Sequence, residues 1–142
     1  MIPRYYGDIE TSLGRGSVFD LIFDEDCSVS KSLEYYLSSE RRTEQYYECL
    51  AHSLVALKNY LLQNRIITMN IKHYNILCQK MTSGIARLFL IDNVYNSEFI
   101  PVSTYLGFFA KRKISRKWQR FEHSLLNLYR NNKVLYRMLN HS

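Results

Sequence analysis

A chain of 142 residues is long enough for one domain with its own core. Its 46% hydrophobic residues, five glycines and two prolines are typical of a globular protein and exclude a disordered one. No apolar run approaches the ~18 residues of a membrane span, and the polar start is unlike a signal peptide, so we expect a cytoplasmic protein.

The number of cysteines and the distribution of charge further limit the class of protein. Cys27, Cys49 and Cys78 are odd in number and widely spaced, so the sequence predicts neither a disulfide framework nor a zinc site. Residues 1–110 carry 10 basic and 12 acidic side chains, whereas residues 111–142 carry 9 basic side chains and 1 acidic one. The net charge of +6 therefore comes from a basic segment that follows a near-neutral body.

The first elements in chain order are β-prone. Residues 5–11 alternate along the chain, residues 13–17 contain two glycines, and residues 18–23 form a second apolar run. This order predicts a β-hairpin whose turn lies at 13–17. The glycines could be mistaken for the phosphate-binding loop of a kinase, but Phe19 replaces the third glycine, which favours the turn.

Two helices are expected next. The first is short, begins at Ser30 as its N-cap and runs through Leu37. After a polar break at 38–42, a long helix is expected over 43–64, with Thr43 as its cap. Its apolar face comprises Tyr47, Leu50, Ala51, Leu54, Ala56, Leu57, Leu61 and Leu62.

Five further elements complete the expected order. They are strands at 76–78 and 85–92, a short helix or loop at 102–110, and helices at 115–128 and 133–139, with a break at Asn131–Asn132. The helix at 115–128 carries an apolar stripe formed by Trp118, Phe121, Leu125 and Leu128. We therefore expect a single α+β domain that is mostly α. Residues 1–27 would form a β-hairpin and a hinge-like segment, and residues 28–142 a helical lobe.

Four polar residues have the spacing of a phosphotransferase site. In such a site the catalytic-loop Asp is followed by Lys two residues later and by Asn five residues later, and a second Asp follows the next strand pair. Here these positions hold Asn70, Lys72, Asn75 and Asp92. Asn75 and Asp92 are candidate ligands of magnesium and, through it, of ATP; the alternative is that both cap turns.

Asn70 stands where the general base would be. Because an amide is not basic in water, Asn70 can orient a hydroxyl but cannot take its proton. General-base assistance contributes about 10²–10⁴-fold to a rate, while positioning and metal electrostatics carry much of phosphoryl transfer. Asn70 and Lys72 therefore form either a vestigial catalytic loop or the loop of a weakened enzyme.

Five stretches together resemble the PhoP regulatory network protein YrbL family, bacterial proteins with a protein-kinase-like fold. They are IPRYYGDIET (2–11), GSVFDLIFDEDC (16–27), LKNYLLQNRIITMNIKHYNILC (57–78), LIDNVYNSEFIPVSTYL (90–106) and RKISRKWQRF (112–121). The resemblance implies a kinase-like C-terminal lobe that begins inside the family pattern and lacks the N-terminal small-lobe part. The resemblance also implies a loop that commonly lacks the aspartate of active kinases, and Asn70 stands at that position here. The family name implies a link to a magnesium-responsive two-component (PhoP) system.

These observations favour a kinase-like regulatory protein, inactive or weak, with a vestigial site for ATP and Mg²⁺. It would act by binding a protein partner or by self-association, because the absent small lobe would leave apolar surface uncovered. The first alternative is an active ATP-dependent phosphotransferase in which Asn70 orients the acceptor. The second is binding of nucleic acid or an anionic membrane through the basic segment 111–120. The apolar stripe within that segment favours the plainer interpretation of a solvated basic face.

Overall fold

A computed structural model describes residues 1–68, 70–91 and 106–140. The elements are β1 (Tyr5–Thr11), β2 (Gly14–Phe19), β3 (Lys31–Ser32), α1 (Leu33–Leu37), α2 (Glu40–Gln45), α3 (Tyr47–Gln63), the 3₁₀ turn η1 (His73–Asn75), β4 (Ile76–Met81), β5 (Gly84–Leu90), α4 (Leu106–Leu128) and α5 (Lys133–Asn140). β1 and β2 pair as an antiparallel hairpin, while β4 lies between β3 and β5 in a second antiparallel sheet. The α+β class and the N-terminal hairpin are thus confirmed.

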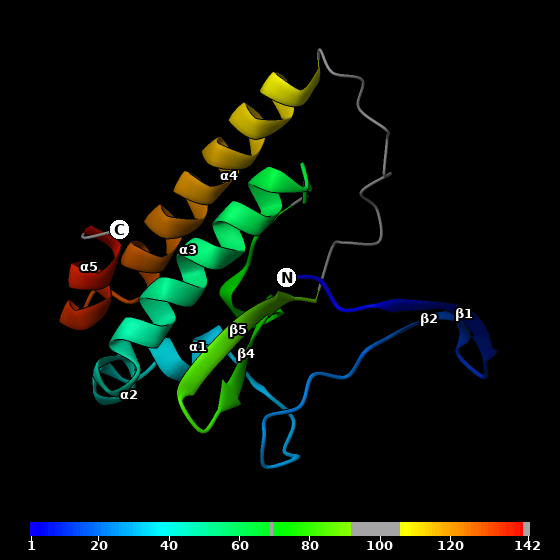
Figure 1. Cartoon of the computed structure of the whole chain (residues 1–142), viewed down its shortest axis with the longest axis horizontal. Coiled ribbons are helices and arrows are strands. Elements are labelled where there is room, and N and C mark those ends of the chain that lie inside the picture. Colours follow the sequence, from blue (N-terminus) through cyan, green and yellow to red (C-terminus); the bar gives the residue numbers. More distant parts are fainter. Residues whose placement is uncertain (69, 92–105, 141–142) are drawn as a thin grey trace.

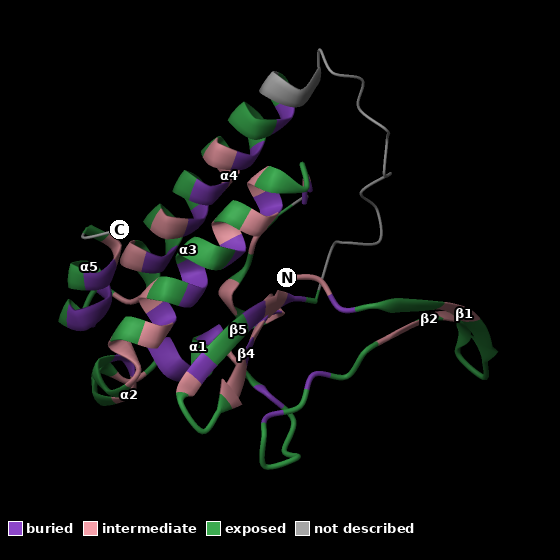
Figure 2. Cartoon of the chain, viewed as in Figure 1, coloured by how far each residue is buried: buried purple, intermediate pink, exposed green. Residues whose placement is uncertain are grey.

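The core lies where α3, α4 and α5 meet one another and the β3–β4–β5 sheet. Figure 1 shows α3 and α4 side by side, with the sheet beneath them and the β1–β2 hairpin projecting to one side. Their buried faces turn toward each other in Figure 2, because apolar residues recur every three or four positions on both helices. These residues are Leu50, Leu54, Leu57 and Leu61 of α3, and Ala110, Ile114, Trp118, Phe121 and Leu125 of α4. Each large apolar side chain buried here contributes roughly 1.5–3 kcal/mol.

The predicted position of the turn in the N-terminal hairpin is wrong. Residues 14–17 belong to β2 and not to the turn, which consists of Ser12 and Leu13 alone. The Thr11 hydroxyl donates to the Gly14 carbonyl (2.6 Å) and accepts from the Leu13 N–H (3.2 Å), so the chain reverses within two residues. β2 also ends at Phe19, before the predicted end at Phe23. Beyond it, the Asp20 N–H donates to the Arg4 carbonyl (2.9 Å), and the Asp20 carboxylate accepts the Arg4 N–H (3.1 Å).

Both predicted helix caps are wrong as well. α1 begins after Ser32, while the Ser30 hydroxyl donates to the buried carboxylate of Asp24 at 2.5 Å. The long helix is divided into α2 and α3 at Tyr46. Thr43 lies inside α2, where its hydroxyl donates to the carbonyl of Tyr36 (3.0 Å) and satisfies a buried acceptor.

β4 and α4 are longer than predicted, and two residues of the expected apolar faces are exposed. β4 extends to Met81, and β5 ends at Leu90. α4 begins at Leu106, nine residues before the predicted start, while residues 92–105 of the expected strand end and short helix lie outside the described residues. Leu128 is 60% exposed, and Ala56 faces solvent too, so each stripe is narrower than its spacing suggested.

The predicted break before the last helix is confirmed. Asn132 directly precedes α5, and its side-chain oxygen accepts from the Leu135 N–H at 3.0 Å. Its side-chain amide donates to the Leu37 carbonyl and the Thr43 hydroxyl. A single buried Asn thereby caps α5 and ties it to α1 and α2. In the described ranges, none of the helices has both the length and the apolar composition needed to cross a bilayer.

Candidate functional site

The loop that carries the motif residues starts where α3 ends. Arg65 adopts a left-handed conformation with a φ of 54°. Its N–H donates to the Leu62 carbonyl (3.4 Å), and the N–H of Ile66 donates to the carbonyl of Leu61 (2.9 Å). This is the hydrogen-bond pattern of a Schellman motif, in which the residues at the Ile66 and Leu61 positions also pack together. Both side chains are buried, so the turn directs the following loop along the core.

Asn75 lies beside the end of β5. Its N–H donates to the carbonyl of Lys72 at 3.0 Å, which closes the 3₁₀ turn η1. Its carbonyl accepts the N–H of Ile91 at 2.9 Å. The last motif residue of the loop is therefore held against the residue that directly precedes Asp92, although Asp92 itself lies outside the described residues.

Asn70 and Lys72 lie on the solvent side of the loop. Both are exposed, whereas Ile71 between them is partly buried and packs against the core. The Lys72 ammonium lies 5.3 Å from the centroid of the Tyr74 ring, within the range of a cation–π contact. Both side chains can thus be reached by a ligand approaching from solvent.

His73 holds the same loop against α1 and against Tyr129, the residue that follows α4, a role that its isolated position in the sequence did not indicate. Its ring contacts Tyr74 and Tyr129 edge to face, with centroids 5.3 and 5.5 Å apart. Its Nε2 lies 3.8 Å from the carboxylate of Glu34 in α1. Burial lowers the pKa of His73, and the Glu34 carboxylate opposes this shift. The imidazole is therefore mainly neutral at pH 7 and acts as a packed ring.

Lys117 of α4 contacts the loop from the opposite side. Its ammonium donates a hydrogen bond to the carbonyl of Thr68, a buried residue just before the motif. Desolvation lowers the pKa of Lys117, and the nearby cations Lys113, Arg120 and Arg116 add to that effect. Sequence reasoning assigned Lys117 to the basic segment alone. The one indication in the sequence that the Lys117 side chain could point toward the core is its position next to the apolar stripe of α4.

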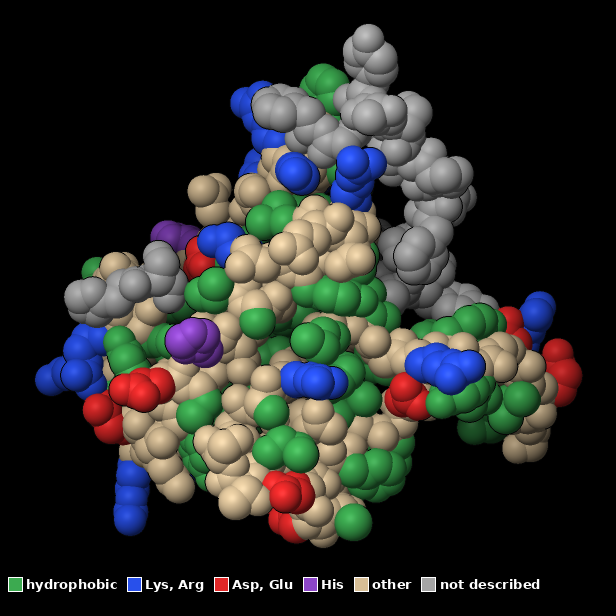
Figure 3. All heavy atoms as spheres, viewed as in Figure 1, with side chains coloured by type: hydrophobic (Ala, Val, Ile, Leu, Met, Phe, Trp, Pro, Cys, Tyr) green, Lys and Arg blue, Asp and Glu red, His purple; other side chains and the backbone are tan. Residues whose placement is uncertain are grey.

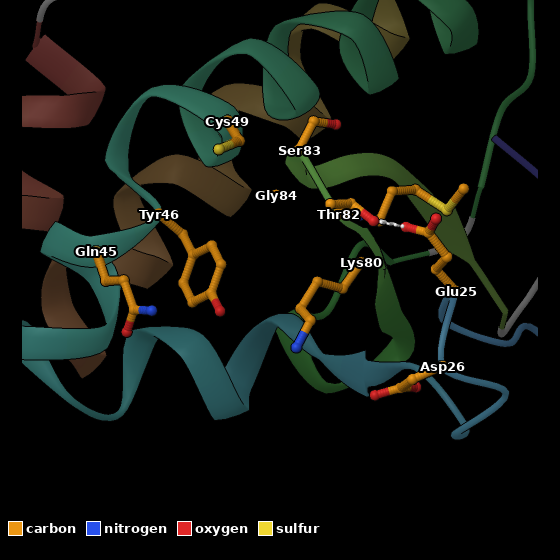
Figure 4. A pocket seen from close by; sticks show the side chains of 10 residues that line it. Glu25, Asp26, Gln45, Tyr46, Cys49, Lys80, Thr82, Ser83 and Gly84 are labelled. Atoms are coloured by element: carbon orange, nitrogen blue, oxygen red, sulfur yellow. Dashed lines mark hydrogen bonds between the residues drawn. The ribbon is translucent and has the colours of Figure 1, made fainter.

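A pocket of about 680 Å³ lies at the far tip of the β4–β5 hairpin (Figure 4). It forms where the acidic turn at 25–26, the hairpin tip and the start of α3 meet. Asn70, Lys72 and Asn75 do not line it. The lining residues are Glu25, Asp26, Gln45, Tyr46, Cys49, Lys80, Met81, Thr82, Ser83 and Gly84.

The two carboxylates of this pocket hold turns of the chain. Glu25 accepts hydrogen bonds from the hydroxyl and the N–H of Thr82, and these bonds lower the pKa of Glu25 (Figure 4). Hydrogen bonds from Ser28 lower the pKa of Asp26 in the same way. Because protein donors already occupy both groups, the acidic turn fits a structural role, namely fastening residues 24–28 to the hairpin tip.

The predicted magnesium ligands are Asn75 and Asp92, and Asp92 lies outside the described residues. In the described part of the chain, no three His, Cys, Asp or Glu side chains are grouped so that they could hold a metal ion. Mg²⁺ is usually bound through one or two carboxylates and by substrate phosphates, and it keeps several waters. The amide oxygen of Asn75 and the carboxylate of Asp92 are oxygen donors of this kind.

Comparison with known proteins found a matching family and two similar sequences. The model of the family described as "PhoP regulatory network protein YrbL" matches residues 1–126, which include all four candidate site positions. The chain is 38% identical over 120 residues to "Uncharacterized protein YrbL" of Escherichia coli (strain K12), and equally so to the protein of that name in Shigella flexneri. Each alignment covers 84% of this chain and 57% of the relative, so the chain spans little more than half the length of these relatives.

No solved structure matches the chain. The fold comprises a three-stranded sheet covered by helices and a separate two-stranded hairpin.

Proposed function

The chain belongs to the PhoP regulatory network protein YrbL family, and from this premise we propose that it is a kinase-like regulatory protein. In this proposal it is catalytically inactive or weak, keeps a vestigial site for ATP and Mg²⁺, and acts by binding a partner. The family name supplies the link to the PhoP regulatory network. The chemistry is inferred from the loop at 70–75 and its surroundings.

The observation that carries the proposal is the hydrogen bond from the Ile91 N–H to the Asn75 carbonyl (2.9 Å). In a phosphotransferase the catalytic-loop Asn and the second Asp share the metal–nucleotide site, so the loop must lie against the strand end that leads to that Asp. This hydrogen bond supports such an arrangement for Asn75 and Asp92. The substitution of the general base by Asn70 supports weak chemistry at the same place.

Partner binding is supported by the exposed apolar side chains of the β1–β2 hairpin. Tyr6, Ile9 and Leu13 are 59%, 55% and 98% exposed. Exposed apolar residues gathered on one projecting element are typical of a surface that another chain covers.

Thermal unfolding in the presence of ATP and Mg²⁺ tests the nucleotide site. A ligand at ten times its Kd stabilises the folded state by about 1.4 kcal/mol, which raises Tm by a few degrees. We expect such a rise at millimolar ATP, and its loss in Asn75→Ala and Asp92→Ala. Asn59→Ala, on the exposed face of α3, is the matched control and should keep the rise. If ATP and Mg²⁺ do not change the Tm of the native chain, the proposed nucleotide site is wrong, and the protein would be a purely protein-binding module.

Transfer of labelled γ-phosphate distinguishes a vestigial loop from an active one. Asn70→Asp restores a carboxylate at the general-base position, and general bases contribute about 10²–10⁴-fold. We expect little or no transfer by the native chain and a higher rate for Asn70→Asp. Turnover by the native chain that Asn70→Asp does not increase would favour the alternative, an active phosphotransferase in which Asn70 orients the acceptor.

A further inference from the structure

Three arginines form a row on the exposed face of α4. Arg112, Arg116 and Arg120 follow at intervals of four residues, so their side chains lie one above the other along about 12 Å of helix. Lys113 lies beside this row, and all four side chains are exposed. Figure 3 shows Lys and Arg side chains gathered where α4 begins, without Asp or Glu among them in this view.

The charge of this row is not compensated by the rest of the described structure. In the described residues, Arg15 and Arg137 form ion pairs and the neutral His73 lies near Glu34, and none of these contacts includes an arginine of the row. Like charges four residues apart on a helix destabilise it, and arginine stays charged at every physiological pH. Glu122, the acidic residue of α4, accepts the indole N–H of Trp118 at 2.5 Å. An external anion is therefore the natural partner for the row.

The opposite, apolar face of α4 helps to distinguish among three possible anionic partners: a membrane, a single nucleic-acid strand and a duplex. Ile114, Trp118 and Phe121 are buried in the core, so they cannot enter the acyl region of a bilayer as the apolar face of a membrane-surface helix does. Trp118 and Phe121 are equally unable to serve as stacking platforms for the bases of a single strand. What remains is a rigid helix that is fixed to the protein by its apolar face and presents cations outward. Helices that lie in or against nucleic-acid duplexes are held in this way.

We propose that the arginine row of α4 binds the phosphate backbone of a nucleic-acid duplex without reading its sequence. Each guanidinium can form two parallel hydrogen bonds to one phosphate, a geometry that lysine cannot offer. Phosphates along one strand follow each other every ~3.4 Å of duplex axis. A row of about 12 Å therefore reaches about three of them, with Lys113 adding charge beside the row. This function uses residues of α4 and not those of the loop at 70–75.

Fluorescence anisotropy with a labelled 20-base-pair DNA duplex tests the proposal over 20–200 mM salt. Each phosphate contact contributes about −0.9 to the slope of log K against log salt. We expect binding at low salt with a slope of about −3 to −4, and the combined Arg112→Ala, Arg116→Ala and Arg120→Ala variant should lower its magnitude by about 3. These positions are exposed, so the variant should keep the native circular dichroism spectrum, and its Tm should not fall, because the repulsion between like charges is removed.

The matched control removes three arginines elsewhere. Arg41, Arg87 and Arg130 are exposed and lie outside α4, so replacing them by Ala changes net charge by the same amount. This control should keep the native slope. An equal loss in the control would assign the effect to net charge and overturn the proposal, as would absence of duplex binding at 20 mM salt.

Two further probes separate the other polyanions. Phosphatidylglycerol vesicles that bind the chain more tightly than the duplex would replace the proposal by a membrane contact. Phe109 is 65% exposed and lies on the same face, one turn before Lys113. Tighter binding to a single strand, lost in Phe109→Ala, would point to base stacking and would also overturn the duplex assignment.

Discussion

The two hairpins of this protein share one turn design and differ in almost everything else. In each, two residues reverse the chain and a glycine with positive φ follows: Gly14 with 110° after β1, and Gly84 with 113° after β4. β4 and β5 bury several side chains in the core, where α3 packs on β5, whereas both faces of β1–β2 are largely open to solvent. The local sequence specifies the turn of each hairpin, but only packing against another element buries the strands in the core.

Polar contacts replace a core in the β1–β2 hairpin. The Asp8 carboxylate accepts the hydroxyls of Tyr5 and Ser17, both at 2.7 Å, and pairs with Arg15 at 3.0 Å. Such exposed contacts contribute little, since ion pairs at a surface are typically worth 0–1 kcal/mol. The hairpin therefore depends on the rest of the protein, or on a partner, for more than its own hydrogen bonds.

Truncation of one apolar residue in each hairpin should give the largest difference between the two regions. Leu88→Ala in β5 removes a fully buried side chain and should lower the free energy of unfolding by about 2–5 kcal/mol. Ile9→Ala in β1 removes one that is 55% exposed and should stay within about 0.5 kcal/mol. Urea unfolding measures both. Equal losses would mean that β1–β2 is packed against the body in solution.

Replacing the two turn glycines should separate backbone strain from packing. Alanine at either position must adopt a positive φ, at a cost of about 1–2 kcal/mol. At Gly84 a Cβ would also lie 2.8 Å from the Cys49 Sγ, so overpacking should add about 1–3 kcal/mol. At Gly14 a Cβ meets no atom within 4 Å. Thermal unfolding should therefore show a clearly lower Tm for Gly84→Ala than for Gly14→Ala, and the comparison fails if the order is reversed.

The smallest effect concerns the amino terminus, which joins the hairpin to the sheet. The Met1 amine donates to the Leu88 carbonyl, and the Met1 carbonyl accepts the Leu90 N–H at 2.8 Å. Burial lowers the pKa of this amine from 8.0 to about 5. Between these two values the unfolded chain binds the additional proton, so the free energy of unfolding should fall as pH decreases from 8 to 5. The group is partly exposed, so the loss should be on the order of 1 kcal/mol after discounting for solvent screening.

An N-acetylated chain is the control for this pH dependence. Its Met1 amide can still donate to Leu88 but carries no proton to gain, so the part of the pH dependence due to the amine should disappear. His73, whose pKa is also lowered, is present in both forms and cancels in the difference. Identical pH profiles for the two forms would show that the amine is solvated.

The sequence predicted the position of the motif loop between a helix and a strand but not the contacts of this loop with other elements. The motif spacing identified Asn70, Lys72 and Asn75 as candidates. Hydrophobic periodicity predicted the helix before them and the strand after them. The contacts of this loop with Glu34 and Lys117 join it to residues 39 and 49 positions away along the chain. A sequence pattern with a period of three or four residues cannot predict such long-range contacts, because they depend on how complete helices and strands pack.

By itself, the sequence determined the features that repeat over short distances: the amphipathic helices, two hairpins closed by glycines, the motif spacing and the basic segment. The misplaced caps show the limit, because Ser30 and Thr43 have the right chemistry for a cap but are used elsewhere. Each hydroxyl satisfies a buried acceptor that exists only after distant segments have met, and leaving such a group unpaired costs about 1–3 kcal/mol. The tertiary structure alone decided which hairpin enters the core, which face of α4 keeps its charge exposed, and where the motif loop rests.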